Sequence, residues 1–213
     1  MIVVTYTFTD GFGEQMAESV KKQGYELAVI KTINRYEQIM RDLYECYKRA
    51  ETGHDYMIYA DAADCYFQRR VNIPTDYILY SAEKNCFPYK KRRSKFTDNS
   101  RWRYLNNGLY GGPIKLVVEF FEKYNLNDIG TKNPQAAAQD AYFDAIKDGF
   151  PIKLDSDCKE FQSYSFIKDD EYEIRDSLIY NRITNTTPAV LHFNGLTDKS
   201  ILNQITNNGT GNL

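Results

Sequence analysis

Histidine and paired cysteines are scarce in this chain. Only His54 and His192 occur among 213 residues, so a histidine-rich metal site is excluded. The four cysteines show no CxxC pairing and no secretory signal precedes them, so neither a zinc knuckle nor a disulfide framework is expected. We predict reduced thiols, mostly buried as small apolar side chains. They are Cys46, Cys65, Cys86 and Cys158.

The chain also lacks long apolar runs and an excess of either charge. No segment approaches the about 20 apolar residues of a membrane span, and no signal-peptide pattern begins the chain. We therefore expect a soluble, cytoplasmic protein without a membrane span. The formal net charge of −2 excludes a globally basic nucleic-acid coat, so nucleic acid is an unlikely partner unless a local patch binds it.

Aromatic residues are abundant. They make up 15% of the chain, with 18 Tyr and 12 Phe, and a disordered chain does not carry that composition. The length suits one sizeable core, and no linker or repeat divides the sequence. We predict a single domain over residues 1–213, with a polar, glycine-rich end at 207–213 that frays.

The first 60 residues alternate between strand and helix patterns. Strands are predicted at 2–8, 25–30 and 56–60, and helices from Gly13 to about 22 and over 35–50. This β-α-β-α-β order predicts an α/β fold with a mostly parallel central sheet flanked by helices.

The remaining elements are less regular. Strands are predicted at 77–82 and 104–112, and helices begin at Pro113 and Pro134. The C-terminal third is more β-like from residue 152, with a last apolar run at 189–193 and a short helix to about 206. In the helix after Pro134 the predicted buried stripe is Ala138, Ala141, Tyr142, Ala145 and Ile146.

Two carboxylates follow a buried strand. The run 56–60 is apolar without alternation, as in a strand buried on both faces, and it stops at Asp61 and Asp64. Carboxyl ends of strands border the ligand crevice in open α/β sheets. If the chain turns after Asp61, both acids meet on a hard cation such as Mg²⁺ or Mn²⁺. Alternatively, Asp61 caps a short helix and Asp64 is solvated.

Two other segments carry alternative interpretations. Thr5, Tyr6 and Thr7 end the first strand, where a nucleotide base or ribose rests in related folds, or they are ordinary strand residues. Residues 89–103 are basic around the single Trp102. This basic segment is a solvated loop, a polyanion contact or a flap over a phosphorylated ligand.

Five short motifs occur in a fixed order. They are YADAAD at 59–64, LYSAEKNCFP at 79–88, YLNNG at 104–108, QDAYF at 139–143 and LHFNG at 191–195. This series resembles the glycosyltransferase domain of the procollagen lysyl hydroxylase family. The resemblance covers roughly residues 1–205 and implies a GT-A-type, Rossmann-like fold.

The resemblance implies a metal-dependent enzyme that moves a sugar from a UDP-sugar to a hydroxyl-bearing acceptor. By position, Asp61, Asp64 and His192 would be ligands of Mn²⁺ or Mg²⁺ and hold the donor's ribose or diphosphate, next to Asn194 and Gly195. A cation there neutralises the departing UDP and lowers the barrier as a Lewis acid.

The same resemblance places further residues at the donor and acceptor. Asn106, Asn107 and Gly108 match donor-sugar positions. Asp140 matches an acidic position, where it either takes the proton of the acceptor hydroxyl or anchors sugar hydroxyls. Glu83 either lines the crevice or pairs with Lys84 or Arg103.

The chain departs from the family in two places, and these keep other functions open. Residues 134–139 are uncharged where relatives carry an acidic run, and Phe87 replaces the usual Trp. One alternative is a non-catalytic nucleotide-sugar or glycan-binding module. Another is a metal-dependent nucleic-acid-processing protein, suggested by the basic segment beside paired carboxylates.

Overall fold

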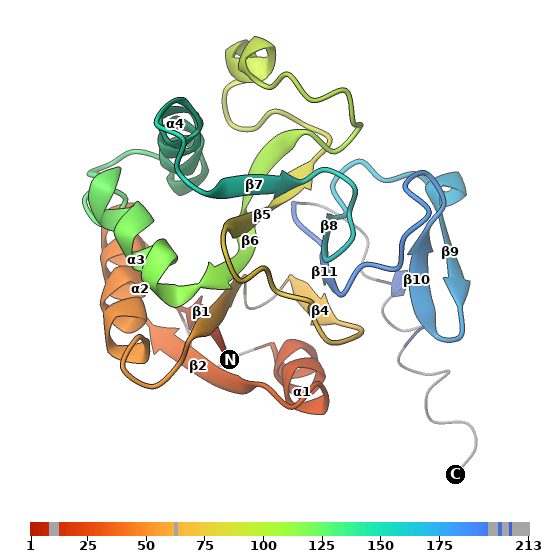
Figure 1. Ribbon diagram of the computed structural model, residues 1–213. Coiled ribbons are helices and arrows are strands. Elements are labelled where there is room, and N and C mark those ends of the chain that lie inside the picture. Colours follow the sequence, from red (N-terminus) through yellow and green to blue (C-terminus); the bar gives the residue numbers. More distant parts are fainter. Residues whose placement is uncertain (9–12, 62–63, 196–199, 202–204, 206–213) are drawn as a thin grey trace.

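A computed structural model describes residues 1–8, 13–61, 64–195, 200–201 and 205. In this part of the chain, a six-stranded sheet has the order β2-β1-β3-β6-β5-β7 (Figure 1). Its strands are β1 Ile2–Thr7, β2 Glu26–Lys31, β3 Tyr56–Ala60, β5 Ile78–Glu83, β6 Tyr104–Pro113 and β7 Ile152–Asp155. The β-α-β-α-β order predicted for the first 60 residues is confirmed.

The sheet is mixed but mostly parallel, as predicted. β1 pairs parallel with β2 and β3, and β5 pairs parallel with β7. β6 runs antiparallel between β3 and β5. Consequently, the carboxyl end of β3 lies beside the middle of β6, which brings Asp61 next to Gly108.

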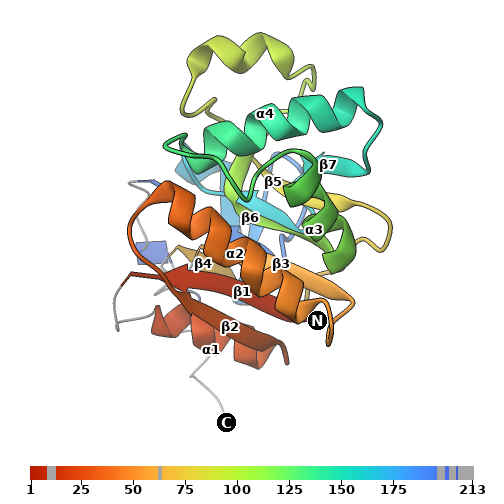
Figure 2. The same ribbon diagram turned by 90° about the vertical axis from the view of Figure 1, so that its left-hand side faces the viewer.

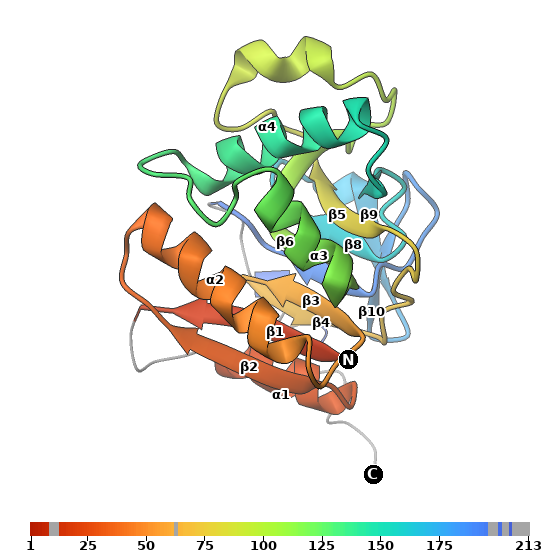
Figure 3. The ribbon, with the colours of Figure 1, turned by 60° about the vertical axis from the view of Figure 1, so that its left-hand side comes forward.

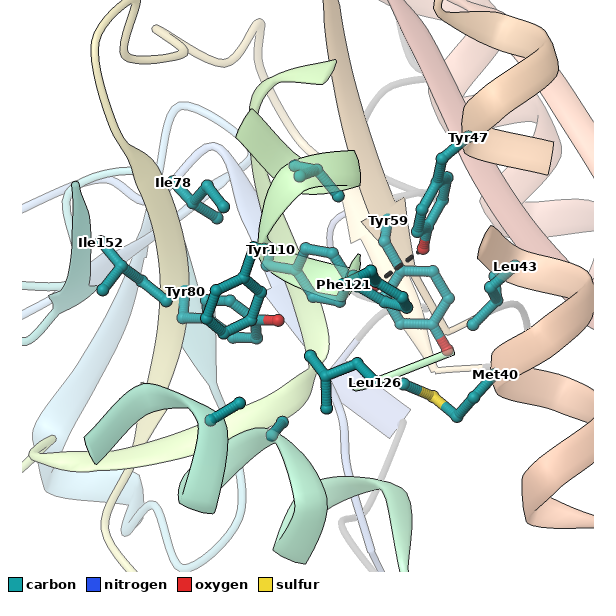
Figure 4. Close-up of a cluster of buried hydrophobic side chains, with 14 of the residues drawn as sticks. Met40, Leu43, Tyr47, Tyr59, Ile78, Tyr80, Tyr110, Phe121, Leu126 and Ile152 are labelled. Carbon is teal, nitrogen blue, oxygen red and sulfur yellow. Dashed lines mark hydrogen bonds between the residues drawn. The ribbon is translucent and has the colours of Figure 1, made fainter. Parts of the chain in front are cut away.

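Three helices cover one face of this sheet (Figures 2 and 3). They are α2 Tyr36–Ala50, α3 Ile114–Lys123 and α4 Pro134–Lys147. The core between them is built on tyrosines: the Tyr80 and Tyr110 rings stack at 4.5 Å, and the hydroxyls of Tyr47 and Tyr110 are 2.7 Å apart (Figure 4). Tyr59 of β3, Tyr80 of β5 and Tyr110 of β6 share this side of the sheet, because alternate side chains of a strand point to the same face.

The buried face of α4 differs in part from the prediction. Ala138, Ala141 and Ala145 are buried as expected, but Ile146 is 51% exposed. Since successive helix residues are about 100° apart, a buried stripe centred on alanines turns position 146 outward. The small side chains bring α4 close to β6. Its N-cap is Asn133, whose side chain accepts from the Ala136 N–H, as the Asn-Pro start predicts.

The opposite face carries α1 Glu14–Lys22 and a three-stranded sheet in the order β4-β11-β8. Its strands are β4 Cys65–Phe67, β8 Phe161–Ser163 and β11 Val190–His192. A two-stranded hairpin, β9 Tyr172–Arg175 and β10 Leu178–Asn181, and two short 3-10 helices, Lys90–Lys95 and Asp169–Glu171, complete the described elements. The pairing of β11 with β4 sets His192 opposite Cys65, directly after Asp64.

Several expectations concern composition or the chain end. All four cysteines are free and buried, as predicted. None of the helices in the described ranges is long and apolar enough to cross a membrane. The expected fraying at 207–213 and most of the expected last helix lie outside the described residues.

Candidate active site

The end of β3 turns sharply at the first predicted metal ligand. The Asp61 N–H donates to the Gly108 carbonyl at 2.9 Å. The Asp61 carbonyl accepts from the N–H groups of Asp64 and Cys65, both at 3.2 Å. The turn that the metal hypothesis required after Asp61 is therefore present, and it leads directly into β4.

His192 lies against this turn. Its Nε2 is 3.5 Å from Asp61 Oδ2, and the Phe193 N–H donates to the Asp64 carbonyl at 2.7 Å. The ring is 1% exposed, and neither of its nitrogens has a hydrogen-bond partner among the described residues. The fold thus brings the side chains of Asp61 and His192 together, from the ends of β3 and β11, and joins the Asp64 backbone to the residue after His192.

Gly108 keeps a space open between Asp61 and His192. A Cβ atom at this position would lie 2.2 Å from His192 Cε1 and 2.6 Å from Asp61 Oδ2. Both distances are far shorter than van der Waals contact, so a side chain at position 108 forces these two groups apart. Glycine is required here for close approach rather than for backbone conformation.

These donors suit a divalent cation of the Mn²⁺ or Mg²⁺ kind. A buried imidazole without a partner is costly unless something binds its lone pair, and a carboxylate oxygen beside it supplies the charge. Tyr59 donates to the other oxygen, Asp61 Oδ1, at 2.5 Å and so orients the carboxylate. No group of three or more His, Cys, Asp or Glu side chains within the described ranges is arranged around one ion position.

A cavity of about 190 Å³ adjoins Asp61 and Gly108. Tyr6 and Asn107, two predicted donor-site residues, line it together with Gln135. Burial, and next the nearby Asp61 carboxylate, raise the pKa of Tyr6 well above its ordinary value, so the hydroxyl stays protonated. Tyr36 and Phe87 also line the cavity and are about half exposed.

Thr5 and Thr7, the other two candidates predicted at the end of the first strand, do not lie beside Tyr6 in the cavity. Thr5 is fully buried and, because strand residues alternate, lies on the opposite face of β1 from Tyr6. Thr7 ends β1, and its carbonyl accepts from the Thr32 N–H. Neither threonine lines the cavity.

Glu83, which the sequence left between lining the crevice and pairing with Lys84 or Arg103, is a functional candidate. It ends β5 at 2% exposure, and Asn194 Nδ2 and Gln135 Nε2 donate to its two oxygens at 3.1 and 2.5 Å. Asn106 is a further hydrogen-bond partner. Burial raises the pKa of this carboxyl to about 8, against the lowering effect of these amides. The signal available was an acidic residue closing a six-residue buried strand.

The alternative that Glu83 pairs with Lys84 or Arg103 is wrong. Lys84 pairs with Glu171, and the Arg103 N–H donates to the Glu83 backbone carbonyl. The Glu83 carboxyl is held by neutral amides instead, which is why burial dominates its pKa.

Asn194 and Gly195 shape the loop after His192. Asn194 Oδ1 accepts from Ser163 Oγ at 2.6 Å and from the Ser165 N–H at 3.0 Å. Gly195 has φ of +74°, which favours glycine. Asn106 is buried, and its Oδ1 accepts from the Gly108 N–H at 3.0 Å, so it fixes the glycine that faces Asp61.

Asp140 lies on α4 and is engaged in ion pairs. Its Oδ1 is 2.7 Å from an Arg92 nitrogen, and its Oδ2 is 3.5 Å from Lys132 Nζ. Its side chain is 38% exposed, in agreement with the prediction that it faces away from the core. It does not line the cavity beside Asp61 among the described residues.

The mixed, mostly parallel sheet flanked by helices is that of a GT-A-like fold, and an acid and an imidazole from two different sheets meet beside a polar cavity. The family model described as PLOD GT domain matches residues 53–210, which is most of the chain. The chain belongs to this family, as its five ordered motifs indicate. No curated protein matches it.

Proposed function

We propose that this protein is a metal-dependent glycosyltransferase that moves a sugar from a UDP-sugar to a hydroxyl acceptor. The observation that supports this most directly is the Asp61–His192 pair. A buried imidazole without a hydrogen-bond partner faces a carboxylate across a space that only glycine leaves open. Membership of the family supports the glycosyltransferase activity itself.

In this proposal Asp61, Asp64 and His192 hold Mn²⁺ or Mg²⁺ together with the diphosphate of the donor. When bound, the cation neutralises charge that develops on the departing UDP. Tyr59 keeps Asp61 oriented through its 2.5 Å hydrogen bond, and Gly108 leaves room for the ion.

The cavity beside Asp61 suits uncharged sugar hydroxyls. Asn107 offers an amide donor and acceptor, and the rings of Tyr6, Tyr36 and Phe87 offer apolar faces for a pyranose. Three residues support the site without lining the cavity. Asn106 fixes Gly108, Asn194 binds Glu83, and Gly195 allows the turn of the loop after His192. Thr5 and Thr7 remain candidates for the nucleotide end of the site.

Asp140 is the position that the sequence predicts for the proton of the acceptor, but Arg92 and Lys132 engage both of its oxygens, so we favour Glu83 for that role. Glu83 has its pKa raised to about 8, so at neutral pH it holds a proton on one of its oxygens next to Asn194 and Gln135. A group with a pKa near the working pH is effective in proton transfer.

The test is turnover of a panel of UDP-sugars, with UDP release measured after chelation and after Mn²⁺ is restored. Asp61→Asn removes one charge at the metal pair and is expected to lower the metal-dependent rate by at least about 100-fold. Asp128→Asn, a surface change outside the site, serves as the control. An unchanged rate in Asp61→Asn, or full activity in chelator, contradicts the metal assignment.

A second candidate is a nucleotide-sugar-binding module without turnover. The observation that favours it is the engagement of Asp140 by Arg92 and Lys132, in a helix start that lacks other acids. Calorimetric binding of UDP with Mn²⁺, together with no UDP release over the whole panel, would establish it. Nucleic-acid processing gains less support, because Arg92 and Arg101 are paired with Asp140 and Glu171.

A further inference from the structure

The basic segment closely follows a residue that lines the candidate site, Phe87. We use the name rim segment for residues 87–95, which run from Phe87 to the end of the 3-10 helix Lys90–Lys95. Phe87 lines the cavity that holds Asp61, and its side chain is 50% exposed. The yellow-green 3-10 helix lies alongside α4 in two views, on the side away from α2 and α3 (Figures 2 and 3). The rim segment therefore joins the cavity to α4.

The backbone of Phe87 is fixed by two glutamines of α4. Its carbonyl accepts from Gln135 Nε2 at 3.0 Å and from Gln139 Nε2 at 2.8 Å. Gln135 also donates to Glu83 and accepts from the Asn107 N–H at 3.4 Å. The first half of α4 thus sets the positions of three groups around the cavity.

Arg92 is the second attachment of the rim segment. Its guanidinium donates to the Ala136 carbonyl at 2.7 Å and to Gln139 Oε1 at 3.1 Å, and it pairs with Asp140. Its side chain is only 12% exposed. A guanidinium this far from water is costly without a nearby negative charge, and Asp140 supplies that charge.

Arg92 is less exposed than the basic residues next to it, which is not expected in a solvated basic loop. Lys90, Lys91 and Arg93 are exposed or partly exposed, whereas Arg92 turns inward, with its guanidinium 4.8 Å from the centre of the Tyr89 ring. The hydrogen bonds and the ion pair of the Arg92 guanidinium all go to residues of α4. The sequence cluster therefore contains one inward cation among several outward ones.

We infer that Asp140 is a positioning residue: through Arg92 it holds the rim segment on α4 and thereby sets Phe87 over the sugar site beside Asp61. This inference rests on the proposed function, because it assigns the effect to sugar placement. Both Asp140 oxygens face cations, Arg92 at 2.7 Å and Lys132 at 3.5 Å. The carboxylate is occupied by these two ion pairs. Removing it should release the rim segment from α4 without altering Asp61 or His192.

The kinetic test compares Asp140→Asn, Arg92→Met and the double variant, using the UDP-sugar that the wild-type protein turns over best. We expect KM for that donor to rise about tenfold with kcat changed less than about threefold. The double variant is expected to be less impaired than the sum of the two single variants, because both single variants break the same Arg92–Asp140 ion pair. Asp140→Glu, which keeps the charge, should restore most of the affinity.

The matched control is Asp148→Asn. Asp148 follows the same helix and pairs with Lys123 at 3.3 Å with 42% side-chain exposure, but it lies at the opposite end of α4 from the cavity. Its kinetics are expected to equal the wild type. A fall in kcat of about 100-fold for Asp140→Asn, repeated in the Arg92→Met background, would show that Asp140 takes the proton and would overturn the inference.

A second measurement does not depend on activity. Trypsin cleavage within residues 90–95 is expected to be several-fold faster in Asp140→Asn and in Arg92→Met than in the wild type and in Asp148→Asn. Equal cleavage rates in all four proteins would overturn the inference. If the wild type turns over no UDP-sugar, the proposed function fails, while the cleavage rates still test the Arg92–Asp140 contact alone.

Discussion

The carboxyl group of Glu83 lies in an environment very different from that of a free side chain. Neutral amides surround it, it has almost no solvent exposure, and burial raises its pKa to about 8 from an ordinary 4.5. In the unfolded chain the same group loses its proton near pH 4.5. Between these values, therefore, the folded protein binds one proton more than the unfolded chain.

This difference predicts how stability depends on pH. Because the folded pKa is raised, the contribution is fully present below about pH 4.5 and is lost as pH rises towards 8. From pH 5 to pH 8 the free energy of unfolding should fall by about 3 kcal/mol through this group. Glu83→Gln, which stays neutral, is expected to remove that fall in urea unfolding curves. An identical pH slope in the variant would contradict the assignment.

Gly108 offers a prediction about space at the site. In Gly108→Ala the added Cβ meets His192 Cε1 and Asp61 Oδ2 at 2.2 and 2.6 Å, so the two groups must separate. We expect Mn²⁺-dependent binding of UDP to weaken by at least about tenfold, measured by calorimetry. Gly53→Ala, where nothing lies within 4 Å of the new Cβ, is the control. Unchanged binding in Gly108→Ala would show that the ion does not lie between Asp61 and His192.

At the scale of elements, α2 is joined to the sheet by a buried pair of hydroxyls. Tyr47 on α2 and Tyr110 on β6 lie 2.7 Å apart, and both are buried (Figure 4). Tyr47→Phe leaves the Tyr110 hydroxyl without this partner and should cost about 1–2 kcal/mol of unfolding free energy.

A double-mutant cycle checks this prediction. Tyr47→Phe with Tyr110→Phe removes both hydroxyls and is expected to be less destabilised than the sum of the single variants. Tyr44→Phe is the control. Tyr44 is also on α2, but its hydroxyl donates to Glu122 of α3 at the protein surface, so this change should cost under about 0.5 kcal/mol of unfolding free energy. Strictly additive single effects would mean that the two hydroxyls do not depend on each other.

The elements that the sequence predicts well are those with long, regular patterns. The strand at 56–60, the helix at 35–50 and the Asn133–Pro134 helix start were predicted because apolar spacing and capping act locally. β4 has only three residues, too few for a pattern, and was missed. Ile146 was misplaced because alanine adds little apolar signal, although several alanines together decide which face of α4 is buried.

The site was predictable only in part, for a related reason. A buried strand ending in Asp61 indicated an acid at a crevice from local pattern alone. His192 reaches that acid because β11 pairs with β4, and no periodicity specifies the register between two strands so distant in sequence. The ordered family motifs supplied that pairing. The ion pair between Arg92 and Asp140 joins separate elements and carried no sequence signal.

At the scale of the whole molecule, the candidate site joins two sheets. Asp61 follows β3 of the six-stranded sheet, and His192 ends β11 of the three-stranded sheet. The backbone hydrogen bond of 2.7 Å between the Phe193 N–H and the Asp64 carbonyl extends the pairing of β11 with β4 to the edge of β3. In the proposed metal site, an ion held by Asp61 and His192 would link the two sheets, and ligand binding to the folded state raises stability by mass action.

We expect Mn²⁺ with UDP to raise the melting temperature of the protein by several degrees, because a ligand at 100 times its Kd adds about 2.7 kcal/mol of stability. His192→Gln should abolish most of that increase, since the neutral amide cannot replace the imidazole in position and donor strength. His54→Gln is the matched control: His54 is the other histidine, lies 3.5 Å from Glu26 and is far from Asp61 along the sheet edge. If both variants keep the full increase, the ion binds elsewhere and the two sheets are not linked through His192. If only His54→Gln loses it, the assignment of the metal site is reversed.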